Sequence, residues 1–159
     1  MKKVLYLISV IAATTMFVTG CNENEDKNEK ATLQAFAKTG CKSSSSATRN
    51  GGDDVFFPET IRYEATADGG LLVNHVNAMF SCEAQITGSV LVEGNEIRIL
   101  EDFTDSGVNC ICPYDLTMKI GPLKNGTYKL KLYIHNFQNE HTSFTFDYSP
   151  SVKGEWTVE

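Results

Sequence analysis

The cysteines are the residues whose type and spacing define the chemistry of this chain most clearly. Five are present in 159 residues, and Cys41, Cys82, Cys110 and Cys112 lie downstream of Cys21. The N-terminus is typical of an exported protein, and an even number of cysteines in an exported protein predicts disulfide bonds. A bond between Cys110 and Cys112 would close a very tight, strained ring. We therefore expect each of these two to pair with Cys41 or Cys82, in either arrangement.

Two alternatives use the same cysteines as thiols. A zinc site would combine Cys82, Cys110 and Cys112 with a histidine such as His75 or His135, because tetrahedral zinc favours sulfur and imidazole ligands. A thiol-exchange catalyst would use Cys110 and Cys112 as a labile pair. The chain has no CxxC spacing to support either alternative, and thiolate sites are rarely maintained in oxidising compartments. We expect no bound metal and no cofactor.

Catalytic motifs are not found in the sequence. It contains no Gly-x-Ser-x-Gly elbow, His-Glu-x-x-His motif, phosphate-binding loop or dinucleotide-binding glycine pattern. The acidic group Glu101, Asp102 and Asp105 could bind calcium, but it lacks EF-hand spacing, so we expect a solvated loop. We expect Asp115 to accept backbone hydrogen bonds rather than to act as a general base. The histidines are scattered: His75, His135 and His141. We predict no catalytic residues.

The N-terminus is typical of a lipoprotein signal peptide. Lys2 and Lys3 precede an apolar run at 4–18, and small residues lead to Cys21. A transmembrane helix usually needs about 20 apolar residues, so the shorter run favours a cleaved export signal over an uncut membrane anchor. We expect residues 1–20 to be removed and Cys21 to carry a lipid that holds the protein on a membrane.

A polar segment follows the predicted lipidation site. Residues 21–54 are rich in Lys, Glu, Asn, Ser and Gly, a composition that cannot bury a core and predicts a flexible tether. Within it, residues 31–37 could form a short helical turn or dock as an edge strand. The net charge of −6, without a basic cluster, argues against nucleic acid as a partner and against adhesion to anionic lipid headgroups. The lipid is therefore the expected link to the membrane.

Beyond residue 55 the apolar residues recur with a period of two, which predicts β-strands. In the clearest case, Tyr128 and the apolar residues at 130, 132 and 134 are expected on a buried face, with Lys129, Lys131 and Tyr133 on the solvated face. Further strands are expected at 61–67, 71–80, 83–92, 96–103, 116–120, 143–148 and 154–158. About eight short strands without a helical pattern predict an all-β fold, an antiparallel β-sandwich over residues 55–159.

A closed barrel is the alternative architecture. The turn at 123–126 followed by Tyr128 favours a sandwich, because it resembles the tyrosine corner of immunoglobulin-like domains, where the hydroxyl bonds to nearby backbone. An ordinary glycine turn before a core tyrosine would have the same sequence. The topology within the sandwich, immunoglobulin-like or not, therefore stays open.

Three motifs occur in order along the chain: Asn-x-x-Phe-x-Cys at 77–82, Cys-x-Cys-x-x-Asp-Leu at 110–116 and Gly-x-Tyr at 126–128. Together they resemble a family of small lipoproteins from Bacteroides-type bacteria to which no activity is assigned. The resemblance covers most of the chain after Cys41 and implies a cysteine-stapled β-sandwich on the cell envelope. Family members often carry a further cysteine where this chain has Glu83, so the resemblance leaves the disulfide pattern open. The acidic run at 22–26 also resembles the tethers that send such lipoproteins to the outer face of the outer membrane.

These observations predict a non-enzymatic, lipid-anchored protein of the outer membrane, exposed on the cell surface. We expect a binding or structural module whose loops contact a glycan or a protein partner. An exposed aromatic strip would favour such binding, with Tyr133, Phe137, Phe56 and Phe57 as its candidates. The alternative is a small envelope enzyme, hydrolytic or thiol-exchanging, or a zinc-binding module that uses Cys110 and Cys112. The enzyme would require a deep pocket containing a residue with a perturbed pKa.

Overall fold

The computed structural model describes residues 30–42, 58–105, 107 and 109–159. The predicted signal peptide, Cys21, most of the predicted tether, and Phe56 with Phe57 lie outside these residues. The described part contains strands and no helix, so no helix in it could cross a membrane. The strands are β1 (Thr32–Lys38), β2 (Thr60–Ala65), β3 (Leu71–Ser81), β4 (Gln85–Glu93), β5 (Glu96–Thr104), β6 (Ile111–Gly121), β7 (Gly126–Ile134), β8 (Glu140–Tyr148) and β9 (Lys153–Thr157).

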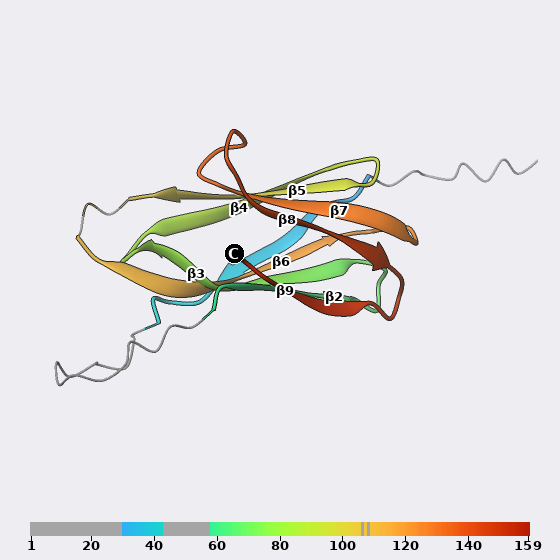
Figure 1. Cartoon of the computed structure of the whole chain (residues 1–159), viewed down its shortest axis with the longest axis horizontal. Helices are drawn as coiled ribbons and strands as arrows, with labels where there is room; N and C mark the ends of the chain where they lie inside the picture. Colours follow the sequence, from blue (N-terminus) through green and yellow to red (C-terminus); the bar gives the residue numbers. More distant parts are fainter. Residues whose placement is uncertain (1–29, 43–57, 106, 108) are drawn as a thin grey trace, which may run out of the picture.

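The strands form two sheets that stack as layers, as Figure 1 shows. The five-stranded sheet has the order β1-β6-β3-β2-β9, and the four-stranded sheet has the order β4-β5-β7-β8. This architecture confirms the predicted all-β sandwich. Neighbouring strands are antiparallel except for β5 and β7, which run parallel. A parallel pair requires a long crossover, and here the chain leaves the four-stranded sheet after β5, forms β6 in the other sheet and returns as β7.

Strand β1 belongs to the sandwich although it lies in the segment that the sequence assigns to the tether. It pairs antiparallel with β6 at the edge of the five-stranded sheet, so the expectation of an edge strand at 31–37 is confirmed and that of a helical turn is wrong. Phe36 packs over Gly88 of β4, where an added Cβ would lie 2.5 Å from the phenylalanine ring. This contact closes one side of the sandwich between its two edge strands.

Alternation along the strands produces the core. Tyr128, Leu130 and Leu132 of β7 are buried between the sheets, as their spacing predicts. Tyr133 points to the opposite face and was expected to be solvated, but it is also buried. The reason is a tertiary contact, since the Phe137 ring from the following loop lies 5.3 Å from the Tyr133 ring, centroid to centroid.

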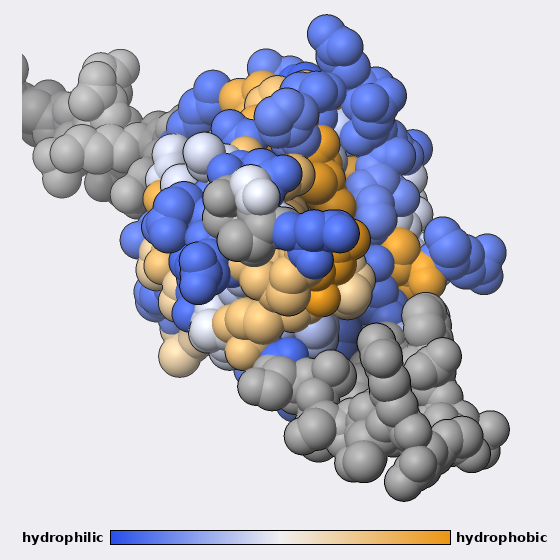
Figure 2. Space-filling model, turned by 90° about the vertical axis from the view of Figure 1, so that its left-hand side faces the viewer, coloured by the Kyte–Doolittle hydropathy of each residue, from blue (hydrophilic) through white to orange (hydrophobic). Residues whose placement is uncertain are grey.

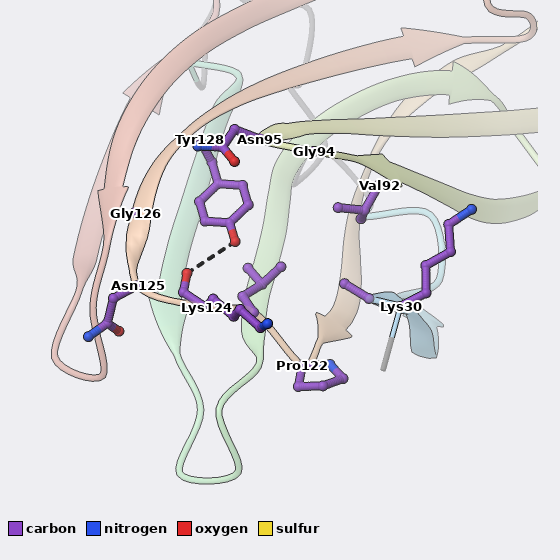
Figure 3. A pocket seen from close by; sticks show the side chains of 11 residues that line it. Lys30, Val92, Gly94, Asn95, Pro122, Lys124, Asn125, Gly126 and Tyr128 are labelled. Atoms are coloured by element: carbon purple, nitrogen blue, oxygen red, sulfur yellow. Dashed lines mark hydrogen bonds between the residues drawn. The ribbon is translucent and has the colours of Figure 1, made fainter. Parts of the chain in front are cut away.

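Tyr128 makes the contact typical of a tyrosine corner, one of the two interpretations that the sequence left open. Its hydroxyl donates a 3.0 Å hydrogen bond to the backbone carbonyl of Lys124 (Figure 3). The same residues line a shallow hollow of about 590 Å³, together with Lys30, Asn95 and Pro122. This hollow lies at the end of the sandwich where β1 begins.

Candidate functional site

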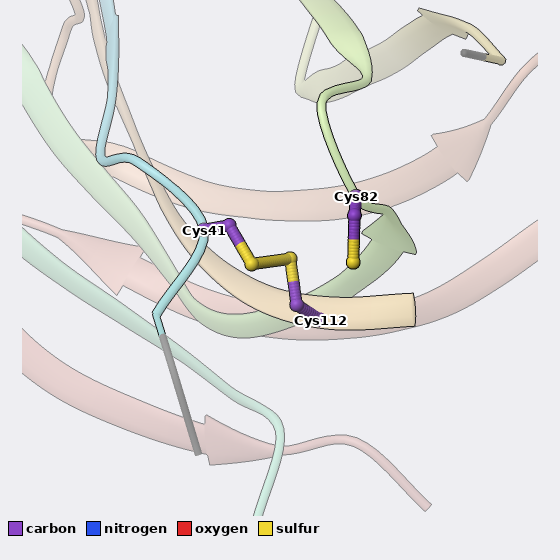
Figure 4. A group of neighbouring side chains, drawn as sticks. All are labelled: Cys41, Cys82 and Cys112. Atoms are coloured by element: carbon purple, nitrogen blue, oxygen red, sulfur yellow. A yellow bond between two sulfur atoms is a disulfide. The ribbon is translucent and has the colours of Figure 1, made fainter. Parts of the chain in front are cut away.

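Two disulfides join the four downstream cysteines, as their even number predicts. The structure selects one of the two expected arrangements, with Cys41 bonded to Cys112 and Cys82 bonded to Cys110. Figure 4 shows the Cys41–Cys112 bond beside Cys82. The sulfur atoms of Cys41, Cys82 and Cys112 all lie within 4.8 Å of one another. Register explains this proximity, because Phe80 of β3 pairs with Cys112 of β6.

Each disulfide ties a different segment to the start of β6. The Cys41–Cys112 bond holds the end of β1 against its partner strand. The Cys82–Cys110 bond joins the point where the chain leaves β3 to the point where it enters β6, and the β4–β5 hairpin of the other sheet lies between them. With these bonds formed, the four sulfurs are not available as the thiolate ligands or exchange pair that the alternatives to disulfides require.

A cluster of two histidines and two glutamates lies between the sheets. His75 Nδ1 donates to both carboxylate oxygens of Glu101, at 2.8 and 3.0 Å, and its Nε2 lies 2.6 Å from Glu59 Oε1. The Nε2 atom of His141 lies 2.6 Å from the same Glu59 oxygen. His75 and Glu101 are fully buried, whereas the side chains of Glu59 and His141 are 20% and 31% exposed. The cluster therefore reaches from the core to the surface.

The four residues come from separate elements of both sheets. Glu59 directly precedes β2 and His75 lies on β3, whereas Glu101 lies on β5 and His141 on β8. Two β-bulges flank the cluster. On β3, Val76 and Asn77 together stand opposite a single residue of β6. On β8, His141 is the extra residue between two that pair with β7. Bulges redirect side chains and are frequent near functional sites.

Charge pairing sets the protonation states in the cluster. Burial by itself would lower the pKa of His75, but the charge of Glu101 and the hydrogen bonds to Glu101 and Glu59 outweigh it and raise the pKa to about 9. Burial would likewise raise the pKa of Glu59, but hydrogen bonds from His141 and His75 lower it to about 2. At neutral pH the cluster thus holds a charged His75 beside the ionised Glu59.

The expectation of a solvated loop for the acidic group at 101–105 is wrong for Glu101. Its side chain follows Ile97 and Ile99 on the inward face of β5, and all three are buried. His75 similarly follows Val73 on the inward face of β3. The same alternation that predicts the strands could have placed both residues inside, but nothing in the sequence pairs a glutamate with a histidine 26 positions away.

Other residues singled out from the sequence have different roles. Asp102 is 52% exposed and contacts His135 at 3.3 Å, so it does not converge with the buried Glu101 on a calcium ion. Asp115 accepts a 3.0 Å hydrogen bond from the backbone N–H of Asn77 in the β3 bulge, as expected for a carboxylate that satisfies backbone donors. It also forms an ion pair with Lys42, next to Cys41.

Exposed apolar side chains gather at the end of the sandwich where the disulfides lie. Met79 and Ile111 are 52% and 70% exposed and line a hollow of about 350 Å³ with Phe103. The space-filling view of one end of the molecule in Figure 2 shows an apolar area among hydrophilic residues. Phe137 is also exposed, whereas Tyr133 is buried. Of the predicted aromatic strip, the described residues therefore expose only Phe137.

The histidine–glutamate cluster is therefore the candidate site, and the two disulfides hold the chain together at the start of β6. Comparisons of the chain with protein-family models, curated proteins and solved structures find no match.

Proposed function

We propose that the protein is a non-enzymatic, lipid-anchored module of the outer cell envelope that presents one end of a stapled β-sandwich to a glycan or protein partner. The observation that carries this proposal is the opposite placement of two features. β1 begins at the end of the sandwich that holds Lys30 and the Tyr128 corner, and it runs to the disulfides at the other end (Figure 1).

With this placement, a lipid on Cys21 would determine which end of the sandwich lies near the membrane. Nine residue steps separate Cys21 from Lys30, and a chain extends by at most about 3.6 Å per residue, or roughly 32 Å in total. The end that contains Lys30 would therefore stay near the membrane. The opposite end, with the exposed Met79 and Ile111, would point outward, where exposed apolar side chains favour contact with a partner.

Two further observations support a non-catalytic role on the envelope. Disulfides persist mainly in oxidising compartments, which agrees with an exported protein. His75 is fully buried and bonds to Glu101 of the other sheet, so this contact joins the two layers of the sandwich, which is a structural role.

Fractionation of cells that express the Cys21→Ala variant tests the anchor. We expect the wild-type protein in the membrane fraction and the variant in the soluble fraction, because the lipid is the proposed attachment. The Cys82→Ala/Cys110→Ala variant is the matched control, since it also loses cysteines but should stay with membranes. Persistent membrane association of Cys21→Ala would refute the anchor, and resistance of the wild-type protein to protease added to intact cells would refute surface exposure.

A further inference from the structure

We infer that Glu59, His75 and His141 form a binding site for one divalent metal ion such as zinc, with Glu101 as the carboxylate that orients His75. This site does not depend on the proposed lipid anchor. It also differs from a cysteine-based zinc site, because its ligands are two imidazoles and one carboxylate.

The donor atoms converge on one point. The Nε2 atoms of His75 and His141 both lie 2.6 Å from Glu59 Oε1, and the three atoms lie within 4.8 Å of one another. Zinc bonds of about 2.0–2.2 Å in tetrahedral geometry place ligand atoms about 3.3 Å apart. A shift of the Glu59 carboxylate by less than about 1 Å would therefore open the coordination position between the two rings. Glu59 lies before the first residue of β2 and is partly exposed, so it has room to move.

Glu101 binds the ring nitrogen of His75 that would face away from the ion. Histidines that bind metals usually donate their other ring N–H to a carboxylate, which fixes the tautomer and the ring orientation. His75 Nδ1 donates to both oxygens of the fully buried Glu101, so one proton is held on Nδ1. The ion would displace the second proton of the charged ring from Nε2 to solvent and bind the Nε2 lone pair.

Charge balance points to a divalent ion. Glu59 and Glu101 together carry a charge of −2, and in the described residues their ion pairs involve only the two histidines. One divalent cation would neutralise both carboxylates while the imidazoles act as neutral ligands. Burial of charge is costly unless it is compensated, and a metal compensates it without requiring that either histidine be protonated.

The site has access to solvent and spans the sandwich. The β8 bulge places His141 at the site. The side chains of His141 and Glu59 are 31% and 20% exposed, so water could reach the ion as a further ligand. Because His75 and His141 belong to different sheets, a bound ion would cross-link the two layers.

Zinc titration of the full-length, disulfide-bonded protein tests the site after chelator treatment and dialysis. We expect one zinc ion per chain by calorimetry. We also expect an unfolding midpoint that rises by roughly 10 °C when free zinc is 100-fold above the dissociation constant. Co²⁺ in place of zinc should give the visible absorption of a low-symmetry site, which adventitious surface binding would not produce.

Matched variants assign the ligands. His141→Ala should abolish binding, whereas His135→Ala should retain it, because His135 is an exposed histidine that contacts a carboxylate outside the cluster. Glu101→Gln should weaken binding by about 10- to 100-fold, as expected for an orienting carboxylate. Glu59→Gln provides a second ligand variant if His141→Ala does not fold in chelator. Failure of the wild type to bind, or equal binding by His141→Ala and His135→Ala, would overturn the inference.

Discussion

Removal of the Cys41–Cys112 bond should destabilise the fold more than removal of the Cys82–Cys110 bond. The two bonds close segments of 71 and 28 residues. In the chain-entropy model these lengths correspond to about 4.4 and about 3.6 kcal/mol at 25 °C. Because small domains are stable by only about 5–15 kcal/mol, loss of both bonds should leave little or no folded protein.

The cysteines must be replaced in pairs. A single replacement would leave one thiol, and the sulfurs of Cys41, Cys82 and Cys112 are close enough for that thiol to attack the remaining disulfide. Alanine is the appropriate substitute at Cys112, since this residue is buried and a serine hydroxyl would need a hydrogen-bond partner there.

Urea unfolding at equilibrium measures the effect. We expect both double variants to have lower midpoints than the wild type, with Cys41→Ala/Cys112→Ala the lower of the two. Their m-values should be higher, because an unfolded chain without the cross-link exposes more surface. In Cys41→Ala/Cys112→Ala, hydrogen exchange should show the largest loss of protection in β1, because the missing bond holds this strand at an edge of the sheet. A loss of less than about 1 kcal/mol for either pair, or a clearly reversed order, would refute the reasoning from loop length.

Two other predictions concern the core and the closed edge of the sandwich. With metal removed by chelator, the charged His75 contributes its full stabilisation below its unfolded pKa of 6.5 and loses it as the pH rises through about 9. We expect the urea midpoint of unfolding to fall between pH 6 and pH 10. A midpoint that does not fall over this range would contradict the prediction. Gly88→Ala should lower the free energy of unfolding by about 1–3 kcal/mol, because the added Cβ would clash with Phe36. Gly40→Ala is the control, since open space surrounds it, and it should change stability by less than about 0.5 kcal/mol. Equal thermal midpoints for the two variants would exclude the clash.

Local periodicity explains which parts of the fold could be predicted. The alternation in β7 predicts both its existence and its buried face, because side chains in a strand point to opposite sides whatever the strand packs against. The Tyr128 corner was also predictable, since its hydroxyl bonds to a carbonyl only four residues away. β1 was ambiguous because its apolar residues, at 33, 35, 36 and 37, do not alternate strictly with polar ones. Its role as a strand depends on hydrogen bonds to β6 and on Phe36 packing over Gly88.

The candidate site depends on contacts that the sequence does not encode locally. The sequence predicts a solvated loop at Glu101 and scattered histidines. The structure instead joins Glu59, His75, Glu101 and His141 across the two sheets. Two bulges and the placement of β3 opposite β5 and β8 bring them together, and both are results of strand pairing over long separations.

The sequence is sufficient to predict the strand-rich composition, the inward face of the regular strands and, from an even set of cysteines, two disulfides. These properties follow from side-chain alternation and from counting, which need no knowledge of neighbours in space. The pairing of the cysteines, the order of the strands and the shared burial of a histidine and a glutamate become visible only in the folded protein. Each of these depends on residues far apart in the chain, and their proximity is set by how the two sheets pair and pack.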